Sequence, residues 1–246
     1  MDVQKDLAVQ SYCFRGFEDN AVVAQKVIDC GISGIELCRK HVNFDDESTW
    51  EAVLDAYKAK DVRVVSIGVA GFAGNPEADE QYMKFAQKAG LKAIAANFNI
   101  DSFPENVRVA EQLAEKYDVK LAIHNHGGHH WLGSTQALRH VFNTSSPRIG
   151  LMLDTAWALH AHEDPVKMAE TFGDRLYGVH LKDFVFDRAG KHEDVVVGTG
   201  NLDLKALSAV LKDTGFSGLN ILEYEGDVEN PVPALVECVE RIGKEL

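Results

Sequence analysis

The sequence predicts an α/β fold built as a single (β/α)8 TIM barrel that spans residues 1–246. Three observations predict it. Eight short apolar runs alternate with amphipathic segments, polar residues end these runs at intervals near 30 positions, and 246 residues is a typical length for one such barrel. The active site of this fold lies at the C-terminal ends of the strands.

The eight apolar runs are the expected strands. Several are apolar at consecutive positions, which is typical of parallel strands buried on both faces. They cover Leu7–Gln10, Gly34–Leu37, Arg63–Ile67, Ala93–Asn97, Lys120–Asn125, Ile149–Asp154, Tyr177–His180 and Leu219–Glu223.

Capping residues predict where several of the intervening helices begin. Asn75-Pro76, Asp164-Pro165 and Asn230-Pro231 each place a capping side chain before a proline, which is favoured at the first helical position. The segment Ser102-Phe-Pro-Glu105 has the spacing of a capping box.

The spacing of the strand ends also locates an insertion. From Glu36 to His180 the polar strand ends follow one another at 26 to 31 positions, close to the length of one βα unit. The last step, from His180 to Glu223, covers 43 positions. We therefore expect an insertion over about residues 184–201 that forms a loop or short hairpin over the site.

Composition limits the partners and the location. The formal net charge is −13, with 38 acidic and 25 basic residues, which is the wrong balance for binding nucleic acid. No apolar run approaches the roughly 20 residues needed to span a membrane, and the first residues lack a signal-peptide pattern. The four cysteines form no C-x-x-C pair, so reduced thiols are expected. These features indicate a soluble, cytoplasmic protein.

Four strand ends carry side chains suited to a divalent metal. They are His124, Asp154, His180 and Glu223. Mixed nitrogen and oxygen ligands suit Mn²⁺, Co²⁺, Zn²⁺ or Fe²⁺ better than Ca²⁺ or Mg²⁺, which favour oxygen.

Residues two positions apart share one face of a strand. Each of three strand ends therefore has a second polar group that we expect nearer the mouth of the barrel. These pairs are His124 with His126, His180 with Lys182, and Glu223 with Glu225.

The ordered motifs resemble the sugar phosphate isomerase/epimerase superfamily, which has the xylose isomerase-like barrel. The resemblance covers nearly the whole chain and implies a divalent metal held by Asp154, His180, Glu223 and a residue of the fifth strand. We expect Mn²⁺, with Co²⁺, Zn²⁺, Fe²⁺ or Mg²⁺ as alternatives. The motifs are Gly31-Ile-Ser-Gly-Ile-Glu36-Leu, Ala122-Ile-His-Asn-His126-Gly, Leu153-Asp154-Thr-Ala, Val179-His180-Leu-Lys182-Asp183, Gly198-Thr-Gly-Asn and Ile221-Leu-Glu223-Tyr.

The chain departs from the family pattern at two positions. The fifth strand of the family usually ends in Glu-Asn-His, whereas this chain has His124-Asn125-His126, and Trp157 stands where the family often has histidine. The resemblance implies that epimerases and isomerases use two metal-bound glutamates on opposite faces of the substrate. Because His124 replaces the first glutamate, the chain is closer to relatives that dehydrate or β-eliminate keto-sugars.

The predicted activity is therefore proton abstraction next to a carbonyl of a keto-sugar or keto-glycoside, through an enediolate and leading to β-elimination. His124 or His126 would be the base or a ligand, and Lys182 would bind a substrate oxygen. The alternatives are a sugar epimerase or isomerase, and a non-catalytic sugar-binding subunit. A DNA-repair endonuclease is disfavoured. Those enzymes bind three zinc ions and have a basic groove, whereas this chain has a net charge of −13 and fewer candidate ligands.

Further polar and aromatic residues near the strand ends are expected to contact the small carbohydrate substrate. Phosphate binding is not indicated, since the chain has no P-loop or G-x-G-x-x-G. Association into a homo- or hetero-oligomer remains open. The predicted substrate contacts are Glu36, Asn97, His129, Trp131, Trp157, Asp183 and Glu225.

Overall fold

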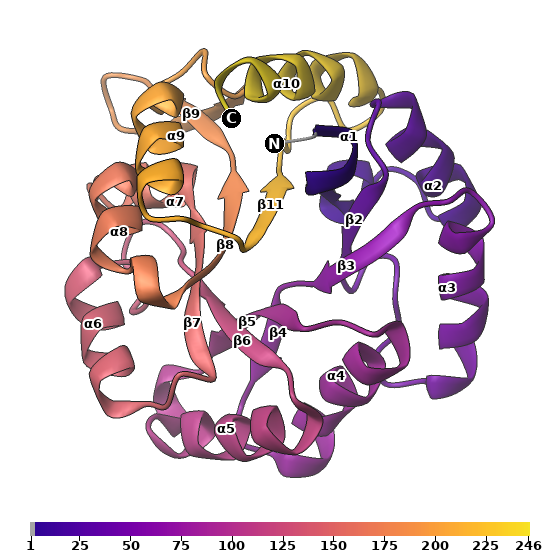
Figure 1. The fold of residues 1–246 in the computed structure, drawn as a ribbon, viewed down its shortest axis with the longest axis vertical. Helices are drawn as coiled ribbons and strands as arrows, with labels where there is room; N and C mark the ends of the chain where they lie inside the picture. The colour runs from indigo at the N-terminus through magenta and orange to yellow at the C-terminus, as the bar shows by residue number, and fades with distance from the viewer. Residues whose placement is uncertain (1–2) are drawn as a thin grey trace.

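The computed structural model describes residues 3–246, which form a nearly closed barrel of parallel strands surrounded by helices (Figure 1). The sheet has the strand order β3-β2-β1-β11-β8-β7-β6-β5-β4. The predicted (β/α)8 barrel is confirmed. Its strands are β1 Leu7–Gln10, β2 Gly34–Leu37, β3 Arg63–Ile67, β4 Ala70–Phe72, β5 Ala93–Phe98, β6 Lys120–His124, β7 Ile149–Asp154, β8 Leu176–Leu181 and β11 Leu219–Leu222.

The third position of the barrel is shared by two strands instead of the single one expected. β3 pairs with β2, and β4 pairs with β5. Gly68 lies between them, where a Cβ atom would sit 2.9 Å from the Glu36 carboxylate and 2.7 Å from Cβ of Ala95. The missing side chain therefore allows the backbone to pass close to Glu36 at the centre of the barrel.

The helices surround the strands, and two of the expected caps are present. Asn75 and Asp164 accept hydrogen bonds from the first turns of α4 and α8, as expected. Two other expectations were wrong. Ser102 belongs to a 3-10 turn instead of capping α5, and Pro231 instead of Asn230 precedes α10. The helices are α1 Val3–Asp6, α2 Asn20–Asp29, α3 Trp50–Lys58, α4 Pro76–Ala89, α5 Glu105–Tyr117, α6 Thr135–Thr144, α7 Thr155–His160, α8 Pro165–Thr171, α9 Leu204–Asp213 and α10 Val232–Glu245.

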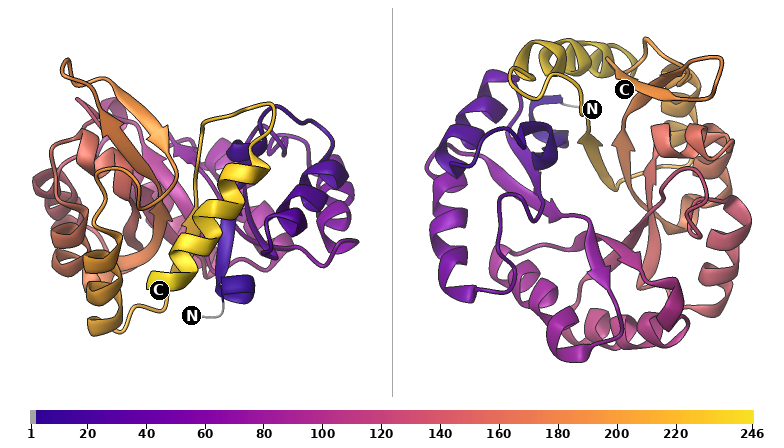
Figure 2. Two further views of the ribbon diagram at one scale, coloured as in Figure 1. Left: turned by 90° about the horizontal axis from the view of Figure 1, so that it is seen from above. Right: turned by 180° about the vertical axis from the view of Figure 1, so that it is seen from behind.

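The expected insertion forms a hairpin of β9 (Asp183–Phe186) and β10 (His192–Val195), which pair antiparallel. Figure 2 shows this hairpin projecting at one end of the barrel, while α1 and the end of α10 lie at the other. Because β9 follows the C-terminal end of β8, the hairpin marks the end of the barrel where the site is expected.

The interior of the barrel contains a separate small cluster of buried side chains, whose members are Ala8, Ala95, Ala122, Met152 and Ile221. Two residues further along their strands, on the same face, stand His124, Asp154 and Glu223. The metal candidates therefore form the next layer above an apolar floor.

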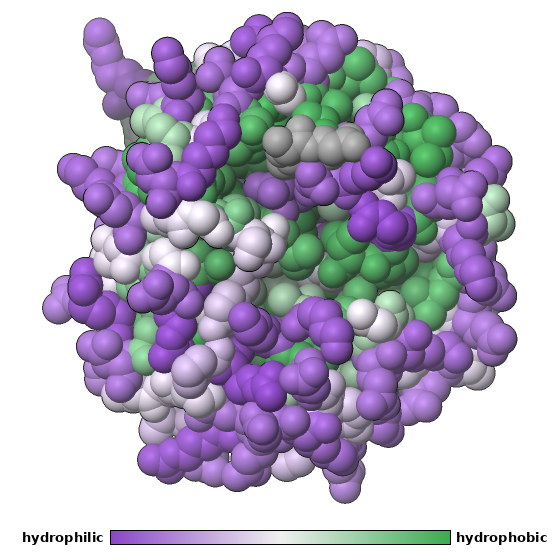
Figure 3. Space-filling model, in the orientation of Figure 1, coloured by the Kyte–Doolittle hydropathy of each residue, from purple (hydrophilic) through white to green (hydrophobic). Residues whose placement is uncertain are grey.

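The face that carries α1 has an apolar centre inside a polar rim (Figure 3). Leu7, Val65 and Leu219 line a hollow there. This end lies opposite the hairpin and the expected site. Within residues 3–246, no helix is both long and apolar enough to span a membrane.

Candidate metal centre

Four side chains from four different strands or strand ends converge at the C-terminal end of the barrel. They are His124, Asp154, His180 and Glu223, and one ligand atom of each lies within 4.8 Å of all the others. Nε2 of His124 lies 3.2 Å from Nδ1 of His180 and 3.5 Å from Oδ2 of Asp154. All four side chains are buried.

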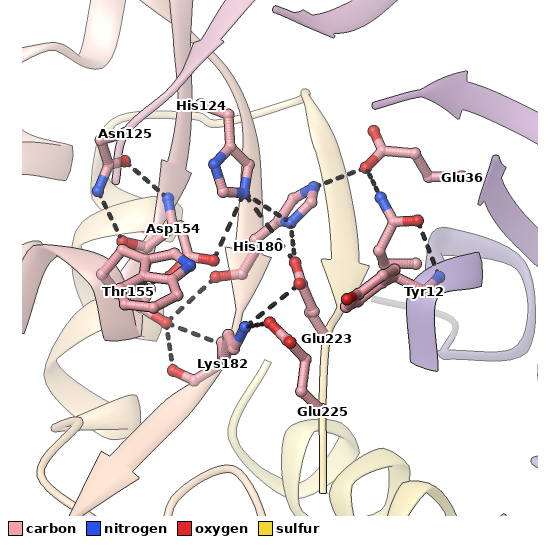
Figure 4. Close-up of polar contacts among 12 residues, drawn as sticks. Tyr12, Glu36, His124, Asn125, Asp154, Thr155, His180, Lys182, Glu223 and Glu225 are labelled. Atoms are coloured by element: carbon pink, nitrogen blue, oxygen red, sulfur yellow. Dashed lines mark hydrogen bonds and ion pairs between the residues drawn. The ribbon is translucent and has the colours of Figure 1, made fainter. Parts of the chain in front are cut away.

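His180 lies at the centre of this group (Figure 4). Its Nδ1 atom is 2.6 Å from Oε2 of Glu223, and its Nε2 atom is 2.8 Å from Oε1 of Glu36. The contact between Nε2 and Glu36 is a close, fully buried ion pair. Burial disfavours the charged ring, but the carboxylates of Glu36 and Glu223 outweigh burial and raise the pKa of His180 to about 10.

Asp154 is fixed by one carboxylate oxygen and presents the other to the centre. Oδ1 accepts a hydrogen bond from the backbone N–H of Trp157 at 2.7 Å and so caps α7. Oδ2 is buried and has no hydrogen-bond partner within residues 3–246. A buried carboxylate oxygen without a donor is costly, and a cation would satisfy it.

Side chains also tie the ligand-bearing strand ends together. Asn125 accepts from the backbone N–H of Asp154 at 2.8 Å and donates to its carbonyl at 3.0 Å. At the start of α7, Thr155 Oγ1 accepts from the backbone N–H of Lys182 at 3.0 Å and contacts the carbonyl of His180 at 3.1 Å. These contacts hold β6, β7 and β8 in register where the backbone ladder ends (Figure 4).

The four residues fit a divalent metal ion. Two imidazole nitrogens and two carboxylates form a donor set that transition-metal ions accept. Ligands about 2.0–2.2 Å from a shared ion lie roughly 3–4 Å apart, and the separations of His124 from Asp154, His180 and Glu223 are 3.5, 3.2 and 4.0 Å. The site can therefore hold a divalent cation.

Lys182 lies beside the centre, just past the end of β8, and is paired with two glutamates. Its Nζ atom is 3.2 Å from Oε1 of Glu223 and bonded to Oε1 of Glu225, with the ring of Trp157 5.2 Å away. Burial would favour the neutral amine, but the surrounding carboxylates outweigh it and raise the pKa of Lys182 above its usual range. In return, Lys182 and His180 hold the pKa of Glu223 well below its usual range despite burial.

A cavity of about 260 Å³ opens over the centre, and we call it the inner cavity. His124, His180 and Glu223 lie at its base, and His126 and Trp157 line it further out. The ring of His126 stacks against Trp157 at 6.1 Å. Burial and the neighbouring His124 and His130 lower the pKa of His126 to about 4, so its ring is neutral near pH 7.

Some predicted substrate contacts lie in this region, and Asp183 does not. Glu225 and Trp157 line the inner cavity, while Glu36 is buried against His180. Both carboxylate oxygens of Asp183 accept backbone N–H groups of the segment that follows the hairpin, namely those of Gly198, Gly200 and Leu202. Asp183 therefore anchors that segment.

Three other predicted contacts line a different cavity. Asn97, His129 and Trp131 surround a space of about 610 Å³, which we call the outer cavity. It lies at the ends of β4 and β5 and against the loop after β6. None of these three lines the inner cavity.

The sequence analysis missed several residues of the inner cavity. Gln10 lines it and donates to Glu36 at 2.5 Å, and Tyr12, Cys38 and Val69 also contribute. Gln10 and Cys38 stand at or beside strand ends and could have been found by applying the strand-end rule to β1 and β2. Tyr12 lies in the 3-10 turn after β1, and Val69 lies between β3 and β4, so neither stands at a strand end.

Comparison with known proteins gives a consistent picture. The sequence pattern of the family described as "Xylose isomerase-like TIM barrel" matches residues 24–242. An inosose dehydratase from Geobacillus kaustophilus (strain HTA426) is 26% identical over 142 residues, which cover 52% of this chain and 46% of that protein. The chain thus spans less than half the length of the curated relatives it matches.

Solved structures share the fold over nearly the full chain. The 3-keto-D-glucoside 4-epimerase YcjR from E. coli has a TM-score of 0.73 at 17% identity, covering 98% of this chain and 99% of that one. The IOLI protein with a binding zinc atom has a TM-score of 0.76 at 15% identity, again covering 98% and 99%.

Proposed function

The chain belongs to the xylose isomerase-like TIM-barrel family, and we propose that it is a divalent-metal-dependent enzyme that removes a proton next to the carbonyl of a keto-sugar or keto-glycoside. We further propose that the reaction continues to β-elimination: a C=C bond forms, the C–O bond at the β-carbon breaks, and the oxygen leaves with a proton as water or an alcohol. Several relatives of the chain are named inosose dehydratase, which supports the proposal of a dehydration.

The observation that carries the proposal is the convergence of His124, Asp154, His180 and Glu223, of which both histidines and Glu223 line the inner cavity. When bound there, a divalent ion supplies Lewis-acid polarisation of the substrate carbonyl. Mn²⁺ is our first expectation, and the zinc in the IOLI structure supports testing Zn²⁺ beside it. Glu36 would keep a proton on Nε2 of His180, leaving Nδ1 to face the ion.

His126 is the residue that we propose as the base, and His124 as a ligand. Nε2 of His124 points into the ligand group, whereas His126 lies outside it and lines the cavity. The low pKa of His126 keeps its ring neutral and able to accept a proton from carbon. Lys182 holds Glu223 and Glu225 in place through its two ion pairs.

Elimination is favoured over epimerisation by the absence of a second glutamate ligand. Glu223 is the only glutamate among the four candidate ligands of residues 3–246. The pair of metal-bound glutamates that the family resemblance implies for epimerases is therefore incomplete in this set. Epimerisation stays the second candidate because an epimerase of 3-keto-glucosides has the same fold.

The test combines metal analysis with product analysis. We expect about one equivalent of a divalent metal in the purified protein and loss of turnover on chelation, restored by adding the metal back. In D₂O, elimination from an inosose or a 3-keto-glucoside gives an unsaturated product by NMR, whereas epimerisation gives deuterium exchange with an intact skeleton. Protein without stoichiometric metal or chelator-sensitive turnover would instead be a sugar-binding subunit.

A further inference from the structure

The outer cavity lies beside the inner cavity at the same end of the barrel. Segments that end neighbouring strands line both: Gly68 and Val69 contact the inner cavity, and Gly71 and Phe72 contact the outer one. The outer cavity is the larger of the two, at about 610 Å³ against 260 Å³. The proposed reaction at the metal centre requires only the inner cavity.

A row of four imidazole rings connects the two cavities. The ring centroids of His180 and His124 are 4.6 Å apart, those of His124 and His126 are 4.7 Å apart, and those of His126 and His130 are 5.1 Å apart. His126 lines the inner cavity and His130 lines the outer one. A molecule lying along this row would reach from the ligand group into the outer cavity.

The outer cavity has an aromatic wall and an apolar rim. The Nε1 atom of Trp131 donates to the carbonyl of Phe98 at 2.8 Å, and Phe103 packs edge-on at 5.2 Å, so the indole is fixed in orientation. Ile100 at the rim is 57% exposed. An aromatic and aliphatic lining with a few polar groups is typical of a pocket for a small ring-shaped ligand.

The polar groups of this cavity offer hydrogen-bond donors. Oδ1 of Asn97 accepts from the backbone N–H of Phe98 at 2.8 Å, while its Nδ2 group has no partner within residues 3–246. Nδ1 of His130 accepts from the backbone N–H of Leu132 at 3.2 Å, which places the proton of the neutral ring on Nε2. Two donors are thus available to an ether or hydroxyl oxygen of a ligand.

We infer that the substrate is a keto-glycoside whose oxidised sugar ring binds in the inner cavity and whose apolar, ring-shaped aglycone binds in the outer cavity against Trp131. This inference rests on the proposed function and narrows its substrate class. The inner cavity is smaller than the roughly 300–1,000 Å³ of ordinary ligand pockets and suits a single ring. The outer cavity supplies the remaining volume.

Kinetics with two matched substrates test this inference. Phenyl 3-keto-β-D-glucoside and free 3-keto-D-glucose differ in the aglycone, which is also the group that leaves when C2–H and C1–O break, so part of any preference is intrinsic to the substrates and is the same for every variant. We expect the wild type to show at least about 10-fold higher kcat/KM for the phenyl glycoside, and Trp131→Ala to lower that ratio at least about 5-fold while changing kcat/KM for the free sugar less than about 2-fold. Trp131→Phe keeps an aromatic ring and should retain most of the preference.

A second variant tests the inference if Trp131→Ala does not fold. A binding measurement tests it if the proposed function is wrong. Ile100→Arg changes an exposed rim position and should also lower only the phenyl-glycoside activity. If neither substrate reacts, the proposed function fails, and calorimetric binding of unoxidised phenyl β-D-glucoside to wild type and Trp131→Ala still tests the subsite. Equal effects on both substrates, or equal binding to both proteins, would overturn the inference.

Discussion

Glu36 at the end of β2 lies 2.8 Å from Nε2 of His180 at the end of β8. The pair crosses the barrel and is fully buried. Because the opposite ring nitrogen faces the other candidate ligands, Glu36 sets which nitrogen of His180 is available to a metal ion. A carboxylate of this kind commonly raises metal affinity without touching the metal.

Replacing Glu36 by Gln should weaken metal binding by about 10–100-fold, because the amide removes the charge that orients and polarises the His180 ring. Competition titration with a chelating dye measures the affinity. Glu18→Gln, at a glutamate whose side chain is 88% exposed, is the matched control and should bind metal as the wild type does. Unchanged affinity in Glu36→Gln would show that the contact does not orient His180.

His124 at the end of β6 and His126 just after it should have different effects when each is replaced by alanine. His124→Ala removes an atom of the ligand group, so we expect the stoichiometric metal to be lost. His126→Ala leaves that group intact and should keep the metal while turnover falls at least about 100-fold, as expected for loss of a general base. Metal analysis of both variants beside their kcat values decides the assignment, and the reverse pattern would exchange the two roles.

Metal binding should release a proton from His180. The pKa of about 10 in the metal-free protein means that this ring is protonated near pH 7.5, and a ligand nitrogen must lose its proton. Calorimetry in buffers of different ionisation enthalpy should give about one proton released per ion, and affinity should rise with pH toward 10. Binding without proton release would place the metal elsewhere.

The same shift predicts how the stability of the metal-free protein depends on pH. The pKa of His180 is higher in the folded state than the unperturbed value of about 6.5. Its contribution to the free energy of unfolding is therefore complete below about pH 6.5 and is lost as pH rises toward 10. Urea unfolding of metal-free wild type across pH 6–10 should show this loss, and the loss should be smaller in Glu36→Gln.

Lys182→Met should destabilise the fold by about 3–5 kcal/mol, because it leaves the buried carboxylates of Glu223 and Glu225 without their cation. Urea unfolding measures the change. Adding Glu225→Gln to Lys182→Met removes one of the two negative charges and should recover part of the loss. A double variant less stable than the single one would contradict this account of the ion pairs.

Asp183→Ala should loosen the segment after the hairpin, since three backbone N–H groups lose their acceptor. Hydrogen exchange at residues 196–202 should quicken, while exchange in the barrel strands stays slow. Asp183→Asn keeps one oxygen acceptor and should show an intermediate effect. Equal exchange in all three proteins would mean that the segment is held by other contacts.

The sequence predicted the barrel and the convergence of His124, Asp154, His180 and Glu223 at one end of it, because both follow from regular geometry. Strand ends recur at the length of a βα unit, and alternation along a strand puts Ala122 and His124 on one interior face. The position of β4 was missed because Gly68 interrupts the third strand, and the reason lies in the distant Glu36 side chain. Such a contact has no local signal.

The outer parts of the site were harder to predict for the same reason. Alternation along the strands predicted that His126, Lys182 and Glu225 lie near the mouth. His126 and Glu225 line the inner cavity, and Lys182 does not. The ring of Trp157 and the carboxylate of Glu225 lie against Lys182, which is buried. Asp183 binds a segment more than a dozen residues away, and this loop closure cannot be derived from strand parity.

Asn125 and Thr155 fix the relative positions of three strand ends without help from the loops. Their side chains join the ends of β6, β7 and β8 from within the strand layer. The loop after β6 and the hairpin after β8 are therefore not needed to keep the candidate ligands in register. We therefore expect the barrel to accept loops of other lengths and sequences at these two places while the four candidate ligands keep their positions.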